Sequence, residues 1–217
     1  MKVVIWDWNG TLLDDVDVSI DIGNKILAKR GLPKLEKQWY KDHFVFPTET
    51  FYRSLGFDFE KDSFGKLSRE FAVRYLPSTL KLKLQPGTCT TLEALKQMGL
   101  RQLILSASEK HLLRFQVRHF KIGSYFEEIL GADDNLGAGK EEVGRRWLAA
   151  VDINPDEVVF IGDSTHDKEI ADIIGCQCIL IPNGHMSKGR LVAAGAQVCD
   201  SIEEVPDRIR GMEGVKR

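Results

Sequence analysis

The sequence has little of several features that would assign a protein to a class at once. It has only four cysteines in 217 residues, at Cys89, Cys176, Cys178 and Cys199. Four is too few, and their spacing too scattered, for a disulfide framework in a chain of this length. We therefore expect all four to be small buried side chains in a reducing, cytoplasmic compartment.

Long apolar runs and an excess of one charge are missing as well. No apolar run approaches the roughly 20 residues of a membrane-spanning helix. The run near the N-terminus is too short for the core of a signal peptide. The formal net charge is −2, from 30 basic and 32 acidic side chains. This balance gives no electrostatic reason to expect binding to nucleic acid or to an anionic membrane surface.

The composition is that of an ordinary globular protein, with 43% hydrophobic and 29% charged residues. From residue 85 onward, segments with strand and helix patterns alternate. Strands are expected at residues 100–105, 125–131, 158–161, 178–181 and 196–199, and helices at 88–98, 109–120, 141–150, 167–174, 188–194 and 203–209. Such alternation predicts an α/β fold with a doubly wound parallel sheet.

A helical block interrupts this pattern directly after the first strand. Acidic residues at helix starts, glycines just past helix ends, and prolines divide it into helices at residues 18–30, 35–44, 47–55 and 61–76. The last of these is expected to end before Pro77. We therefore predict a core domain formed by residues 1–13 and 86–217, with an inserted all-α domain formed by residues 14–85.

Polar side chains stand where three of the expected strands end. Asp7 follows the apolar run that begins at Val3, and Ser106 and Asp163 follow two later strands. Lys140 stands at the start of a helix. Because the carboxyl ends of parallel strands meet at one edge of the sheet, we expect these groups to converge there.

The chemistry of this set indicates phosphoryl transfer. Carboxylates with a nearby backbone carbonyl form an oxygen-ligand site that suits Mg²⁺. A hydroxyl group, a lysine and backbone N–H groups suit the oxygens of a phosphoryl group. An aspartate beside Mg²⁺ can act as a nucleophile and form an aspartyl-phosphate.

Four segments in order resemble the motifs of the haloacid dehalogenase (HAD) superfamily, and in particular its phosphoglycolate phosphatase-like members. Residues 7–12 (Asp-Trp-Asn-Gly-Thr-Leu) resemble the first motif, Asp-x-Asp-Gly-Thr-Leu. Ser106 resembles the Ser or Thr of the second motif, and Lys140 the basic residue of the third. Residues 162–167 (Gly-Asp-Ser-Thr-His-Asp) resemble the acidic fourth motif. The inserted helices resemble the family's cap domain.

The resemblance implies a HAD-like Rossmannoid core and a role for each matching residue. Asp7 would be the nucleophile and a Mg²⁺ ligand, and Asp163 a second metal ligand. Asp167 would support the metal directly or through water. The backbone carbonyl of Asn9 would supply a further contact to the metal, whatever its side chain.

The transferred phosphoryl group would bind four residues. Ser106 and Lys140 would contact it with their side chains, and Gly10 and Thr11 belong to the phosphate-binding turn of the first motif. The sequence around Lys140 is not a P-loop, because Asp134 and Glu141 occupy positions that require glycine and Ser or Thr.

Asn9 departs from the family pattern. The family's phosphatases have an aspartate here, which acts as general acid and then general base. An amide cannot exchange a proton in this way, and such help is typically worth about 10²–10⁴-fold. Turnover of alkyl phosphates should therefore be slow, and Asn9→Asp should raise it unless another group supplies the proton. The candidates for that group are Asp14, Asp15, His166 and His43.

The sequence thus predicts a Mg²⁺-dependent cytoplasmic phosphatase that acts on a small phosphorylated metabolite, as a monomer or weak homodimer. The main alternative is a catalytically weak relative that binds a phosphorylated ligand or a partner. A phosphoacceptor regulatory domain is disfavoured because the candidate nucleophile lies on the first strand. The insert residues His43, Thr48 and Arg53 could face a substrate, but the sequence does not identify that substrate.

Overall fold

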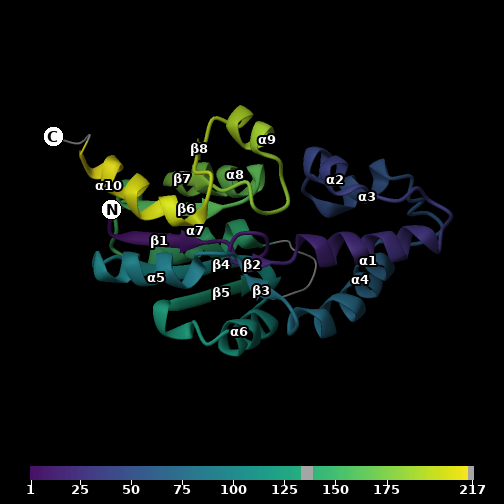
Figure 1. Cartoon of the computed structure of the whole chain (residues 1–217), viewed down its shortest axis with the longest axis horizontal. Helices are drawn as coiled ribbons and strands as arrows, with labels where there is room; N and C mark the ends of the chain where they lie inside the picture. Colours follow the sequence, from purple (N-terminus) through teal and green to yellow (C-terminus); the bar gives the residue numbers. More distant parts are fainter. Residues whose placement is uncertain (133–138, 215–217) are drawn as a thin grey trace.

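The computed structural model describes residues 1–132 and 139–214, and it has a six-stranded, fully parallel sheet at its centre (Figure 1). The strand order is β5-β4-β1-β6-β7-β8. The strands are β1 (Val3–Trp6), β4 (Arg101–Glu109), β5 (Glu128–Ala132), β6 (Val158–Gly162), β7 (Gln177–Leu180) and β8 (Gln197–Val198). The doubly wound parallel sheet predicted from the sequence is confirmed.

Strand β1 lies in the middle of the sheet and is completely buried. Its last residue, Trp6, is in register with Ile104 of β4 and with Ile161 of β6. Its continuous apolar sequence suits this place, because both faces of a central parallel strand are covered by helices. The residues that follow these three strands therefore emerge at one edge of the sheet.

Helices cover both faces. On one face lie α5 (Thr88–Gln97), α6 (Lys110–His119) and α10 (Val205–Gly214), and on the other lie α7 (Lys140–Ala150), α8 (Thr165–Ile174) and α9 (Lys188–Ala193) (Figure 1). Short 3-10 turns occupy Gly123–Tyr125, Pro155–Glu157 and Ile202–Glu204. Side chains of β1 alternate between the two faces: Val4 packs in the first layer of helices and Ile5 in the second.

The inserted residues form four helices, α1 (Val16–Ala28), α2 (Lys37–His43), α3 (Thr48–Ser54) and α4 (Phe64–Thr79). Two short strands, β2 (Leu13–Asp14) and β3 (Lys83–Leu84), pair antiparallel where the chain leaves the core and returns to it. We call residues 14–85 the helical insert. It lies at the end of the molecule away from the N-terminus and α10 (Figure 1).

Three expectations from the sequence are wrong. Strand β4 does not end before Ser106 but continues to Glu109. Helix α4 does not end before Pro77 but continues to Thr79. A proline in the last turn removes only one helical hydrogen bond, so the helix can tolerate it there. The cysteines are not all buried, because Cys89 is exposed and Cys176 is half-buried.

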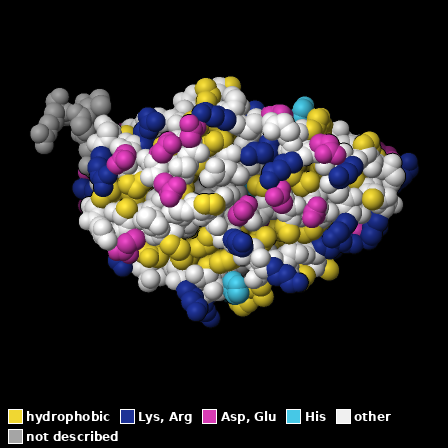
Figure 2. All heavy atoms as spheres, in the orientation of Figure 1, with side chains coloured by type: hydrophobic (Ala, Val, Ile, Leu, Met, Phe, Trp, Pro, Cys, Tyr) yellow, Lys and Arg dark blue, Asp and Glu magenta, His cyan; other side chains and the backbone are white. Residues whose placement is uncertain are grey.

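The surface carries charges of both signs, mixed over the face seen in Figure 2. This agrees with the balanced composition and shows no broad patch of one sign on that face. Within residues 1–132 and 139–214, no helix is both long and apolar enough to cross a lipid bilayer.

Candidate active site

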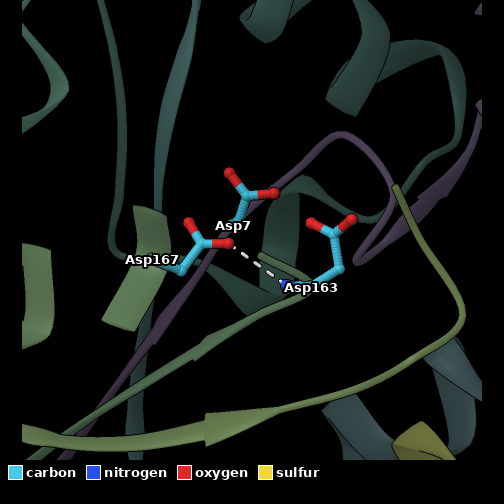
Figure 3. A group of neighbouring side chains, drawn as sticks. All are labelled: Asp7, Asp163 and Asp167. Atoms are coloured by element: carbon cyan, nitrogen blue, oxygen red, sulfur yellow. Dashed lines mark hydrogen bonds between the residues drawn. The ribbon is translucent and has the colours of Figure 1, made fainter. Parts of the chain in front are cut away.

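Three carboxyl groups meet at the carboxyl edge of the sheet, as predicted (Figure 3). Asp7 follows β1, Asp163 follows β6, and Asp167 lies in the first turn of α8. One oxygen of each lies within 4.8 Å of one oxygen of the other two. All three side chains are buried, with at most 7% of any residue exposed.

Lys140 lies between two of these carboxylates. Its Nζ is 2.6 Å from Oδ1 of Asp7 and 2.6 Å from Oδ1 of Asp167. Burial alone would lower the pKa of Lys140, but the charges of Asp167 and Asp7 raise it above its usual value. The lysine therefore stays protonated and holds a fixed positive charge beside the candidate nucleophile.

Asp167 is engaged through both of its oxygens. Oδ2 accepts hydrogen bonds from the backbone N–H of Asp163 (3.1 Å), which Figure 3 shows as a dashed line, and from the N–H and hydroxyl of Ser164 (3.0 and 2.7 Å). With Ser164 at the N-cap of α8, this forms a capping box. Asp167 thus fixes the loop that carries Asp163.

Two glycines, one in the loop after β1 and one in the loop after β7, allow those loops to pack closely against Asp163. A Cβ added at Gly10, where φ is +76°, would lie 2.4 Å from Oδ2 of Asp163. A Cβ at Gly184 would lie only 1.9 Å from the same atom. No side chain other than hydrogen fits at either position without moving the carboxylate.

Of the predicted phosphate-binding residues, Thr11 and Lys140 contact the Asp7 carboxylate directly. Oγ1 of Thr11 lies 3.2 Å from Oδ2 of Asp7 and 3.3 Å from Oδ1 of Asp163. Ser106 is buried in β4, and its Oγ accepts the backbone N–H of Ser108 (3.1 Å). The N–H of Gly10 donates to Leu13 and to Asp15 of the same loop, so its contact with phosphate stays a prediction.

Three residues that the sequence interpretation missed complete the site. His185, in the loop after β7, donates its backbone N–H to Oδ2 of Asp163 and places its ring Nε2 3.3 Å from Oδ1 of Asp15. Tyr40 of α2 and Tyr75 of α4 reach the same network from the helical insert. A signal was present for His185, because it follows a strand that ends at the same sheet edge.

Other candidates lie elsewhere. His43 and Arg53 are exposed on the insert, where Arg53 pairs with Glu49, and Thr48 begins α3. His166 lies in the first turn of α8 and stacks on Phe46 of the insert, with ring centroids 4.8 Å apart. Asp134 and residues 137 and 138 lie outside the described residues.

Among the described residues of this site, acidic side chains outnumber basic ones. The four carboxyl groups exceed the two cationic side chains by two charges when all are ionised; the six residues are Asp7, Asp15, Asp163, Asp167, Lys140 and His185. Burial raises the pKa of Asp7 to about 6, against the lowering effect of Lys140. Burial also raises the pKa of Asp163 to about 7. Lys140 thus offsets only part of the effect of burial on Asp7, and a divalent cation fits this set of oxygen donors.

Comparison with known proteins agrees with this geometry. Residues 4–181 match the model of the haloacid dehalogenase-like hydrolase family. The chain belongs to this family. All four of its candidate motifs lie within the matched region, and so does the whole helical insert.

Related proteins and solved structures extend this comparison along the chain. Phosphoglycolate phosphatase 1 of Pseudomonas aeruginosa is 26% identical over 216 residues, which cover 94% of this chain and 78% of that protein. A phosphoglycolate phosphatase of Vibrio vulnificus is 26% identical over 218 residues, covering 95% of both. A haloacid dehalogenase-like hydrolase from Streptococcus pneumoniae shares the fold, with a TM-score of 0.81 at 19% identity over 96% of this chain and 98% of that one.

Proposed function

We propose that the protein is a Mg²⁺-dependent phosphatase that hydrolyses a small phosphate monoester through an aspartyl-phosphate on Asp7. One observation carries this proposal: the Asp7 carboxylate lies at the end of the central strand, between the Lys140 ammonium and the Thr11 hydroxyl. The carboxylate is thereby oriented and kept near a positive charge. The phosphoglycolate phosphatases among its relatives support the same reaction class.

The residues that would hold the metal are Asp7, Asp163 and the backbone carbonyl of Asn9. Asp167 would contact the metal through water, or would only hold neighbouring residues in place, because Lys140 and Ser164 already bind its two oxygens. Bound Mg²⁺ would offset the charge of the carboxylates and of the phosphoryl oxygens.

In the first step, a carboxylate oxygen of Asp7 attacks phosphorus and the bond to the leaving oxygen breaks. Lys140 stabilises the negative charge on the phosphoryl oxygens, and the Ser106 hydroxyl in the neighbouring strand is a further donor. In the second step, water attacks the phosphorus of the aspartyl-phosphate, which releases inorganic phosphate and restores Asp7. The leaving oxygen takes up one proton, and the attacking water gives up one.

The helical insert would act as the cap that selects the substrate and excludes water. Two contacts join it to the core beside the site: Lys41 Nζ donates to the carbonyl of Pro182 (2.8 Å), and the N–H of Ser187 donates to the carbonyl of Lys41 (3.0 Å). Lys41 thus brings a cationic side chain of the insert to this contact with the core, so a small anionic phosphate ester such as 2-phosphoglycolate is the first substrate to test.

The second candidate function is binding of a phosphorylated ligand with little turnover. Asn9 favours it, because its amide cannot move a proton to the leaving group or from water. Hydrolysis of p-nitrophenyl phosphate and 2-phosphoglycolate with Mg²⁺ separates the two functions. We expect turnover that Asp7→Asn lowers by at least about 10³-fold. Equal rates for the wild type and Asp7→Asn on both esters would contradict a phosphatase and leave the binding function.

A further inference from the structure

Asp15 lies at the N-cap of α1, but its side chain does not cap that helix. An aspartate at this position would ordinarily accept the N–H of the second or third helical residue. Here the carboxylate is buried, with 2% of the residue exposed, and it turns back toward the loop that carries Asp7. A buried carboxylate that is not needed for capping must be stabilised by other partners.

Four groups donate to the Asp15 carboxylate. Oδ1 accepts the N–H of Gly10 (2.8 Å) and lies 3.3 Å from Nε2 of His185. Oδ2 accepts the amide of Asn9 (2.9 Å) and the hydroxyl of Tyr75 (2.6 Å). These partners come from three separate parts of the chain: the loop after Asp7, helix α4 of the insert, and the core loop after β7.

The contacts extend to the other side of the insert through His185. Its Nδ1 is 2.8 Å from the hydroxyl of Tyr40, in α2. The same core loop binds the end of α2 through the backbone of Ser187, and Arg190 of α9 donates to the carbonyl of Phe44. Asp15 therefore joins α4 of the insert directly to the loop of the candidate nucleophile, and His185 connects it to α2.

Asn9 is engaged at both ends of its amide. Nδ2 donates to Asp15, and Oδ1 accepts the hydroxyl of Ser108 (2.7 Å). A carboxylate at position 9 would keep the second contact but would place two like charges about 3 Å apart in a buried site, which is strongly unfavourable. The amide at position 9 and the carboxylate at position 15 are thus complementary.

We propose that Asp15 is a positioning residue, which ties closure of the helical insert to the loop of the candidate nucleophile, and that position 9 is an amide because it donates to Asp15. The contact with Tyr75 fixes α4, and the contact with His185 fixes the core loop that binds α2. The contacts with Asn9 and Gly10 fix the loop after Asp7, which we call the catalytic loop. The catalytic part of this inference rests on the proposed phosphatase activity. The coupling between insert and core does not.

Hydrogen exchange measured by mass spectrometry tests the coupling without any activity. Asp15→Asn is compared with Asp14→Asn, which removes the same charge from an exposed neighbour. We expect Asp15→Asn to accelerate exchange at least about fivefold in two distant peptides, one around Tyr75 and one covering residues 182–187. Equal exchange in Asp15→Asn and Asp14→Asn would overturn the proposal.

Tyr75→Phe provides a milder variant that removes one hydroxyl and leaves the ring in place. Tyr75 makes no hydrogen bond or ring contact with residues 182–187, so faster exchange there reports transmission through the network that its hydroxyl shares with Asp15 and Asn9. Acceleration confined to α4 would mean a local hydrogen bond only, and would overturn the coupling.

A charge swap tests the pairing of positions 9 and 15. Asn9→Asp should lower the melting temperature by about 4 °C, because two carboxylates then face each other. In Asn9→Asp/Asp15→Asn an amide and a carboxylate face each other again, and at least half of the lost melting temperature should return. A double variant less stable than the sum of the single variants would overturn the pairing.

Kinetics with p-nitrophenyl phosphate test the role in catalysis. A positioning residue should affect kcat more than KM, so we expect Asp15→Asn to lower kcat about 10-fold and to change KM less than about threefold. A change in KM alone would overturn this part. If the wild type shows no turnover at all, the proposed function fails, whereas the exchange and swap measurements still decide the coupling.

Discussion

The ammonium nitrogen of Lys140 lies 2.6 Å from both the Asp7 and the Asp167 carboxylates, and all three side chains are buried. The lysine thereby joins the residue after β1 to the first turn of α8, and it does so from the first turn of a third element, α7. Its charge serves folding and chemistry together, because the same carboxylate that it stabilises is the candidate nucleophile.

Lys140→Met should destabilise the protein strongly. It leaves two carboxylates buried without their cation, a loss typically worth about 3–5 kcal/mol. Without Lys140, the pKa of Asp7 in the folded state rises further above that of the unfolded chain, and the pKa of Asp167, which Lys140 holds below its usual value, rises as well. Their ionisation then opposes folding, so the loss of unfolding free energy should grow as pH rises from 5.5 to 8. Urea unfolding without added Mg²⁺ at several pH values measures it.

Lys2→Met is the matched control, since Lys2 pairs with Glu157 on the surface. An exposed pair of this kind contributes about 0–1 kcal/mol, so that variant should unfold almost as the wild type does. If Lys140→Met lost no more than Lys2→Met at pH 8, the carboxylates would have other partners and the role given to Lys140 would be wrong.

The sequence was sufficient to predict the fold and where Asp7, Ser106 and Asp163 lie. Asp7 and Asp163 follow apolar strands, and Ser106 follows the apolar part of β4; parallel topology brings the ends of such strands to one edge. These placements depend on local pattern and on one rule of topology. Little tertiary detail is needed for them.

The network around Asp15 could not be predicted in the same way. The sequence offers Asp15 as a candidate proton carrier, and Tyr75 is 60 residues away from it in sequence. Their contact depends on how the helical insert packs on the core, which periodicity does not encode. The sequence alone predicts that Asn9→Asp raises turnover. The structure places a buried carboxylate beside position 9, so we also expect this variant to lose stability.

Mg²⁺ should stabilise the folded protein. An ion at 100 times its dissociation constant adds about 2.7 kcal/mol to the unfolding free energy when it binds only the folded state. Urea midpoints with and without MgCl₂, at matched ionic strength, measure this effect. Asp163→Asn should remove most of it, whereas Asp152→Asn, at an exposed position, should keep it. Equal Mg²⁺ stabilisation in both variants would exclude Asp163 as a ligand.

Gly10→Ala should lower the unfolding free energy by more than the strain of the backbone conformation alone would. Gly31 has a similar φ of +65° with no atom within 4 Å of an added Cβ, so Gly31→Ala reports conformational strain alone, about 1 kcal/mol. At Gly10 the new methyl group would meet Asp163 and the ring of His185. We expect a further loss of about 1–3 kcal/mol and weaker Mg²⁺ stabilisation. Equal losses of unfolding free energy in the two variants would contradict the close packing of Asp163.

The rate of the first chemical step should depend steeply on the leaving group. Asn9 cannot protonate a departing oxygen, so esters whose leaving group is stable as an anion avoid the deficit. The quantity to compare is the ratio of kcat/KM for aryl phosphates to kcat/KM for alkyl phosphates. We expect this ratio to be about 10²–10⁴-fold larger here than in a phosphatase that has a general acid. A series of monoesters with graded leaving-group pKa measures the slope, and kcat/KM is the appropriate parameter because it excludes hydrolysis of the aspartyl-phosphate. A shallow slope would mean that another side chain delivers the proton. In that case His185 is the first residue to replace, because its ring lies against Gly10 of the catalytic loop.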